Sequence, residues 1–248
     1  MKTRKQDIIF SIGVILLFLP FILSNDVFDF YFQFNHDHIL ITSFIKFAIL
    51  ATMGELIGLR IRTGSYYVDG FGVLPRMLVW GFLGITIYMA MVISASGTPK
   101  LLENLGVSNA QHAILQSFTL KKLFVAFCIS LALNVVYAPV MMTLHKITDM
   151  HILATGGTLK GFFTSINFGK LFVDLDWNIQ WNFVFKKTIP FFWIPAHTIT
   201  FLLPADFRIL FAAILGVALG IILAIADLIG SDEKINRKKN KIELIKKQ

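Results

Sequence analysis

Long apolar segments constrain this chain more than any other feature of its sequence. Six of them stand out, and they run approximately over 7–24, 39–59, 73–96, 123–144, 188–204 and 207–229. A helix that crosses a bilayer needs about 17–25 apolar residues, and an isolated strand in lipid would leave its backbone groups unpaired. The sequence therefore predicts an all-α, polytopic membrane helix bundle with about six transmembrane helices.

The composition also favours a membrane protein. Hydrophobic residues make up 56% of the 248 residues and charged residues only 15%, with a mean hydropathy of +0.70, whereas soluble domains carry about 25% charged residues. The single cysteine, Cys128, excludes an intramolecular disulfide and a zinc site built from several thiolates. We interpret 1–230 as one transmembrane domain and 231–248 as a basic tail.

Positive charge is distributed unevenly among the connections between the six segments. If the N-terminus is cytoplasmic, the inner connections and ends hold 18 of the 23 Lys and Arg residues, and the outer ones hold 4. The positive-inside rule then predicts that both termini face the cytoplasm and that 35–38 faces outward. The bilayer is the predicted partner, with anionic lipid at the basic tail. No nucleic-acid-binding fold accompanies the net charge of +8, so we predict no nucleic-acid partner.

Two long connections are predicted to contain amphipathic surface helices. In the outer connection, the stretch over 98–106 has a capping threonine, a proline at the first helical position and a terminal glycine. In the inner connection, Trp177, Trp181 and Phe185 recur every four residues and so share one helical face. This spacing suits a helix that lies among the lipid headgroups. Packing of the same aromatic face on the bundle is the alternative.

Small residues recur every four positions in two of the apolar segments. The last segment has Ala212, Gly216, Gly220 and Ala224, and the second has Gly54 and Gly58. Small side chains at this spacing let two helix backbones approach closely inside a membrane. We therefore predict helix packing within the chain at these six positions. Formation of a homo-oligomer through the same face is the alternative.

Few polar residues lie inside the apolar segments, and those few are candidates for function. Ionisable groups in a bilayer are costly and often functional, so Glu55 is a candidate for lining a pore. Structural pairing of Glu55 with Arg60, Arg62 or Arg76 is the alternative. Asn134 interrupts the fourth segment, where an amide typically forms a hydrogen bond to another helix.

Histidines and carboxylates gather in two short stretches, which raises the question of a metal site. The first stretch offers His36, Asp37 and His38, and the second offers His145, Asp149 and His151. The predicted topology puts the two stretches on opposite sides of the membrane, and neither alone supplies a ligand set of known spacing. We therefore predict no metal and no cofactor. No nucleophile–base pattern or phosphate-binding loop is present either, so we do not expect an enzyme.

The stretch "FFWIPAHTITFLLP" over 191–204 is almost wholly apolar, yet it contains two prolines. Inside a membrane, neighbouring helices and hydroxyl side chains can satisfy the backbone groups that a proline frees. We expect Pro190 in a first helical turn, a kink at Pro195 and a helix end at Pro204. His197 and Thr200 add polar groups near the kink, and Arg208 is expected to pair with Asp206 or to anchor the next helix at the interface.

The order Trp193, Pro195, Phe201, Pro204 and Arg208 resembles the C-terminal signature of a known family. That family contains the twenty-two-kilodalton peroxisomal membrane protein and its mitochondrial inner-membrane relatives. The resemblance covers about 39–229, and Gly54–Glu55 stands where the family has Gly–Asp. The chain departs from the signature where Ile194 separates Trp from Pro and where Thr200 replaces Asn. The resemblance implies a distant bacterial member in the inner membrane, and channel-like and solute-homeostasis roles have been proposed for its relatives.

Two functions are therefore expected for this chain. The first is a channel or carrier for small solutes. The second is a non-transporting membrane protein that organises lipids or partner proteins, which the scarcity of intramembrane charge favours. In either case the candidate pore or structural polar site comprises Glu55, Asn134, Trp193, Pro195, His197, Thr200, Pro204 and Arg208.

Overall fold

The computed structural model describes residues 4–246 and, among these, the side chains of 4–225. Within that range every regular element is a helix, which confirms the predicted all-α class. The predicted basic tail over 231–248 lies outside the described side chains. In chain order the elements are α1 Lys5–Leu23, α2 Asn25–Asp37, α3 Ile39–Thr63, α4 Val73–Asn104, α5 Ala110–Ala113, α6 Leu120–Val136, α7 Ala138–Ala154, α8 Leu159–Phe162, α9 Phe168–Asp174, α10 Trp177–Ile179, η1 Gln180–Trp193, α11 Ile194–Leu202 and α12 Ala205–Lys246.

Within the described part of the chain, four helices are long and apolar enough to cross a membrane. They are α1, α3, α4 and the part of α12 over Ala205–Ile225. The pair α6 and α7 is bent by 43° between its two halves and makes a fifth span if it is counted as one. The prediction of about six spans is not confirmed, because the segment expected over 188–204 is divided between the end of η1 and the nine-residue α11.

The two prolines at the start of this segment explain its irregular geometry. η1 is a π-helix, Pro190 lies inside it, and Pro195 is the second residue of α11 and is exposed. The expected position of Pro190 in a first helical turn is therefore wrong. Two prolines five residues apart remove two backbone donors, so a regular α-helical ladder cannot pass through this stretch. α11 ends at Leu202, as Pro204 predicts.

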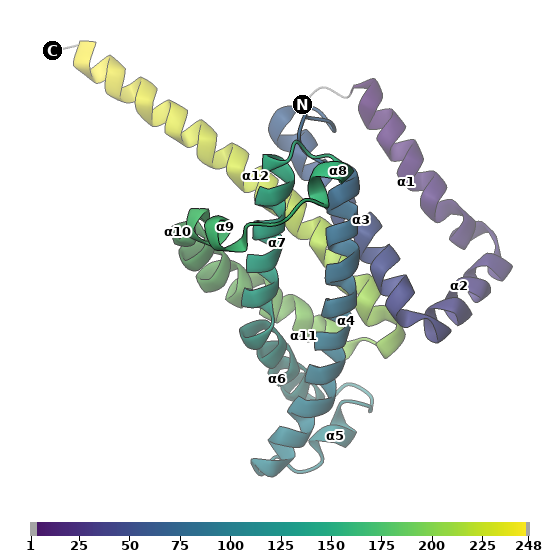
Figure 1. The fold of residues 1–248 in the computed structure, drawn as a ribbon. Helices are drawn as coiled ribbons and strands as arrows, with labels where there is room; N and C mark the ends of the chain where they lie inside the picture. The colour runs from purple at the N-terminus through teal and green to yellow at the C-terminus, as the bar shows by residue number, and fades with distance from the viewer. Residues whose placement is uncertain (1–3, 247–248) are drawn as a thin grey trace.

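The outer connection also differs from the prediction for 98–106. α4 runs without interruption through Pro99 to Asn104, so this stretch is the end of a 32-residue helix and not a separate surface helix. Gly106 then adopts a φ of +96°, a conformation that favours glycine, and ends the helix. In the connection after α7, α9 and α10 lie together on one side of α7 in Figure 1, and α8 lies on its other side, near α4.

α3 occupies the centre of the bundle and packs against α4 on one side and α12 on the other. The contact with α12 is formed by the predicted small residues: a Cβ on Gly58 would lie 3.2 Å from the carbonyl oxygen of Gly220 and 3.7 Å from the Cβ of Ala224. Because these positions have no larger side chain, the two backbones come into direct contact. The hydrophobic core continues into α6 and α11, where Val125, Ala126, Ile129, Leu133 and Phe201 are buried.

α1 and α2 form an arm that contacts the bundle through polar groups and through a few aromatic side chains, among them Phe10 and Phe18. No side chain of α1 is buried, and α1 stands beside the bundle in Figure 1. Near its start, Asp7 accepts two hydrogen bonds of 2.7 Å from Arg60 of α3. At the end of α2, Asn35 accepts hydrogen bonds from Thr42 and Lys46. The side chain of Asn35 is buried within the α2–α3 contact, and the location of 35–38 on the outer side of the membrane stays a prediction.

One end of the bundle carries three arginines from α3 and α4. Arg60, Arg62 and Arg76 lie where α3 ends and α4 begins, and we call this the basic end. The first turn of α1 reaches the same end, because Asp7 binds Arg60 there. α12 also runs toward it, since Ala224 lies beside Gly58. The first described residues of α1 and the C-terminal part of α12 thus lie on the same side of the bundle (Figure 1).

Candidate functional site

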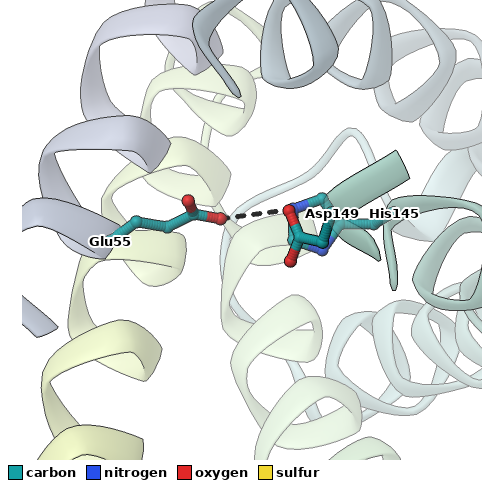
Figure 2. Close-up of side chains that lie close together, drawn as sticks. All are labelled: Glu55, His145 and Asp149. Atoms are coloured by element: carbon teal, nitrogen blue, oxygen red, sulfur yellow. Dashed lines mark ion pairs between the residues drawn. The ribbon is translucent and has the colours of Figure 1, made fainter. Parts of the chain in front are cut away.

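Near the basic end, four charged or titratable side chains from three helices meet inside the bundle. Glu55 comes from α3, Arg76 from the first turn of α4, and His145 and Asp149 from successive turns of α7. We call these four residues the polar cluster. Figure 2 shows Glu55 pointing from its helix toward His145 and Asp149, which lie next to each other on α7.

Hydrogen bonds and ion pairs connect all members of the polar cluster. Nη1 of Arg76 donates to Oε2 of Glu55 at 2.7 Å and to Oδ1 of Asp149 at 2.6 Å. Nε1 of Trp80 donates to the other oxygen of Glu55, Oε1, at 2.8 Å. Nε2 of His145 lies 3.2 Å from Oε1 of Glu55, but it is buried and lacks an aligned hydrogen bond. The cluster therefore contains one guanidinium between two carboxylates, with an imidazole beside them.

The polar cluster is largely shielded from its surroundings. The exposed fraction of the side chain is 7% for Arg76, 17% for Glu55, 15% for Asp149 and 19% for His145. Two carboxylates and one guanidinium leave one formal negative charge when His145 is neutral. A buried charge is costly unless it is paired and hydrogen-bonded, so Arg76 makes the burial of both carboxylates tolerable.

A second polar group lies deeper, where α6 meets α11. Nδ2 of Asn134 donates to the carbonyl oxygen of Ser130 at 2.8 Å and lies 3.0 Å from Nδ1 of His197. The hydroxyl of Ser130 donates to the carbonyl oxygen of Ile194 at 2.7 Å. The ring of His197 stacks on Trp193 with 5.1 Å between the ring centres. These bonds hold the irregular start of α11 against α6.

Two separate cavities lie beside the polar cluster and the Asn134–His197 pair. The larger has a volume of about 440 Å³ and is lined by the polar cluster together with Arg62, Lys146 and Gln180. It reaches the surface, because the exposed residue Lys146 is part of its wall. The smaller has a volume of about 40 Å³, lies against Asn134 and His197, and has room for only a few water molecules.

The wall between the two cavities is built from bulky and flexible side chains. Trp80, Met141, Met142, Trp193 and Gly216 line both of them. Nε1 of Trp193 is buried without a hydrogen-bond partner among the described residues. A buried donor of this kind usually finds an acceptor in water or in a ligand. The wall between the cavities thus contains a hydrogen-bond donor, Nε1 of Trp193, that no described residue accepts from.

The structure brings together only half of the predicted candidate site. Glu55, Asn134, Trp193 and His197 line one or both cavities. Pro195 is exposed, and the hydroxyl of Thr200 is buried in a bond to the carbonyl oxygen of Ala196. These two residues line neither cavity.

Arg208 and Pro204 lie at the opposite end of α11 from the cavities. Nε and Nη2 of Arg208 donate to the carbonyl oxygens of Leu203 and Phe201, at 3.0 and 3.2 Å. The guanidinium therefore binds the C-terminal end of α11, whose last carbonyl groups lack helical donors. Arg208 thus donates to backbone carbonyl groups and not to its expected partner, Asp206. Pro204 separates α11 from α12.

Several residues of the polar cluster were missing from the predicted site. The sequence offers Arg76 as one of three partners of Glu55 and gives no role to Trp80, which donates to Glu55. It groups His145 and Asp149 with His151 and not with Glu55. In the structure, Nε2 of His151 instead lies 3.2 Å from the carbonyl oxygen of Phe162. The helical spacing was therefore a usable signal, whereas the approach of α3 was not readable from the sequence.

Comparison with known proteins gave no match: no protein-family model, curated protein or solved structure is significantly similar to this chain. The functional argument therefore depends on the geometry of the two cavities and on the residues that line them.

Proposed function

We propose that this protein is a carrier for small polar solutes. The observation that carries the proposal is the cavity of about 440 Å³, which reaches the surface near the basic end and has the polar cluster in its wall. Ligand pockets typically have volumes of about 300–1,000 Å³ and combine apolar walls with a few placed polar groups. Intramembrane ionisable residues that face such a cavity commonly mark a solute path.

A carrier fits the geometry better than a permanently open channel. The large and small cavities are separate volumes, and Trp80, Met141, Met142 and Trp193 stand between them. A solute that enters from the basic end would therefore meet a closed wall. Passage would require this wall to rearrange, which is the behaviour of alternating access. The irregular η1–α11 segment carries Trp193 and is the element we expect to move.

The family resemblance and the membrane orientation belong to the same proposal. We infer a distant bacterial member of the family of the twenty-two-kilodalton peroxisomal membrane protein, placed in the inner membrane with both termini in the cytoplasm. The order of Trp193, Pro195, Phe201, Pro204 and Arg208 supports the membership, and the charge distribution supports the orientation. In this orientation the large cavity reaches the cytoplasmic side.

Solute flux into proteoliposomes tests the proposal directly. We expect the purified protein to accelerate uptake of small uncharged and anionic organic solutes, and we expect no steady single-channel conductance. Trp193→Ala removes part of the wall between the cavities and should increase the flux. Trp181→Ala is the matched control, because Trp181 is a largely exposed tryptophan that lines neither cavity. No flux above protein-free vesicles, or equal effects of the two variants, would contradict the proposal.

One further feature favours the second function, the organisation of lipids. An apolar groove of about 580 Å³ lies between α7 and the surface helices, and its lining includes Phe168, Phe172, Trp177 and Phe185. The hydroxyl of Thr143 in this groove already donates to the carbonyl oxygen of Pro139. An acyl chain suits such a groove, since water needs several polar partners.

The groove offers a simple test, because Gly169 is part of its wall. A Cβ on Gly169 would have no contact closer than 3.9 Å, so Gly169→Leu should fill the groove without a clash. We expect this variant to lose co-purifying phospholipid, measured by mass spectrometry, whereas Gly97→Leu at another open position should keep it. Unchanged lipid in Gly169→Leu would remove the support for this second function.

A further inference from the structure

Three potential metal ligands converge within the polar cluster. Nε2 of His145 lies 3.2 Å from Oε1 of Glu55 and 3.8 Å from Oδ1 of Asp149. One such atom from each residue lies within 4.8 Å of the others. Nitrogen and oxygen ligands bind a transition metal at about 2.0–2.2 Å, which places neighbouring ligands roughly 3–3.5 Å apart. Small side-chain shifts would therefore bring all three atoms onto one ion.

The imidazole is placed as a metal ligand would be. Nε2 of His145 is buried and has no hydrogen-bond partner among the described residues. The ring packs on Trp80 with 4.3 Å between the ring centres, which fixes its plane. Figure 2 shows the imidazole and the carboxylate of Asp149 side by side, facing the carboxylate that arrives from α3. A buried nitrogen that lies 3.2 Å from a carboxylate oxygen without an aligned hydrogen bond requires an explanation.

The carboxylate of Glu55 is already oriented by neighbours that would remain outside the metal's own ligands. Arg76 binds Oε2, whereas Trp80 donates to Oε1, the oxygen that faces His145. Hydrogen bonds of this kind typically fix the ligating side chains of a metal site. Arg76 also binds Asp149, so one guanidinium positions both carboxylates.

We propose that Glu55, His145 and Asp149 bind one divalent transition-metal ion, such as Mn²⁺, Fe²⁺, Co²⁺ or Zn²⁺. An imidazole combined with two carboxylates suits these ions, whereas Mg²⁺ and Ca²⁺ prefer sites made only of oxygen. Water in the cavity of about 440 Å³ supplies the remaining ligands. The proposal does not depend on transport, because the same site can hold a bound ion in a protein that carries nothing.

Charge sets the expected strength of binding. The two carboxylates and Arg76 together carry one negative charge when His145 is neutral, so the site attracts a dication. Arg76 and the cations that line the same cavity, Arg62 and Lys146, oppose it. We therefore expect weaker binding than at a structural zinc site, and binding should weaken when His145 is protonated, because the ligand must be the neutral imidazole.

Titration of the chelator-treated, detergent-purified full chain tests the proposal. Mn²⁺ binding is followed by electron paramagnetic resonance, and Co²⁺ binding by quenching of tryptophan fluorescence, since Trp80 lies against His145. We expect one equivalent of either ion to bind with saturation, and an excess of Mg²⁺ should not displace it. The absence of a saturable site would overturn the proposal.

Three variants separate this ligand set from a set that includes His151, the neighbouring histidine in the sequence. His145→Gln and Asp149→Asn should each weaken Mn²⁺ binding by at least about tenfold, since even loss of an outer partner costs that much. His151→Gln should leave the affinity unchanged, because His151 lies beside the carbonyl oxygen of Phe162. Unchanged affinity in both cluster variants, or an equal loss in His151→Gln, would refute the proposed ligands. Thermal unfolding without metal identifies any variant that fails to fold. If His145→Gln fails to fold, the Mn²⁺ affinity of Asp149→Asn, which keeps the side-chain shape, decides whether the proposed ligands are correct.

Discussion

Replacing Gly54 with alanine tests the contact between α3 and α12. The added Cβ would lie 2.7 Å from the Cα of Val217 and 3.3 Å from the carbonyl oxygen of Gly216. Non-bonded carbon atoms prefer separations of about 3.5–4.0 Å. Because Val217 Cα belongs to the backbone, a rotamer change cannot relieve the overlap, and the two helices have to move apart.

Gly216 provides a control with the same chemical change on the facing helix. A Cβ at Gly216 would meet Ala51 Cβ at 3.9 Å, which is ordinary van der Waals contact. Alanine is favoured over glycine in a helix by about 1 kcal/mol, so Gly216→Ala should keep or slightly raise stability. Overpacking costs about 1–3 kcal/mol, so after the same gain of about 1 kcal/mol Gly54→Ala should lower stability by up to about 2 kcal/mol.

The helix gain is the same in both variants, so they should differ by the overpacking cost of about 1–3 kcal/mol. For a chain of this size, that difference corresponds to about 2–12 °C in the midpoint of thermal unfolding. Circular dichroism of the purified proteins in one detergent measures this midpoint. Equal midpoints for Gly54→Ala and Gly216→Ala would show that the close approach of α3 and α12 does not limit stability, and the packing argument would fail.

Three other predictions test the topology, the polar cluster and the ends of α11. In a cysteine-free background, His36→Cys should react with an impermeant reagent on intact cells and Tyr67→Cys only after lysis, since both side chains are exposed; the reverse pattern would invert the orientation. Arg76→Met leaves two carboxylates without their cation and should cost about 3 kcal/mol of stability, seen as a lower unfolding midpoint, and an unchanged midpoint would contradict the pairing. Arg208→Lys should lower the free energy of unfolding by about 1–3 kcal/mol, because lysine lacks the planar group with which Arg208 binds two carbonyl oxygens. Pro195→Ala changes an exposed position and should alter the free energy of unfolding by less than about 1 kcal/mol. Equal losses of stability in these two variants would contradict the different roles assigned to them.

The long spans and their packing face could be predicted because their signals are local. Hydropathy alone identified α1, α3, α4 and the start of α12, and the four-residue spacing of small side chains identified the surfaces that join α3 to α12. In both cases a few neighbouring positions determine the outcome. Burial in lipid leaves little choice of secondary structure for such segments.

The irregular elements could not be predicted because their structure depends on distant neighbours. No particular amino-acid composition marks a π-helix. Pro190 and Pro195 therefore indicated that the helix is irregular here, but not which irregular form it takes. Pro99 was expected to begin a helix, yet α4 continues through it. The polar cluster forms because Glu55 lies close to His145 and Asp149 in the folded chain, although about ninety positions separate them in the sequence. Only the tertiary fold supplies that proximity.

The polar contacts of η1 and α11 have a consequence for how the chain is assembled during synthesis. α1 has no buried side chain, so it can enter the bilayer early and remain there as an independent helix until the later helices are inserted. The η1–α11 stretch contains two prolines and two lysines, and its inward groups bind Thr143, Ser130 and Asn134 of helices made earlier. We therefore expect this stretch to be retained in the membrane only after α6 and α7 have been inserted, so a chain that lacks those two helices should release it to the aqueous side.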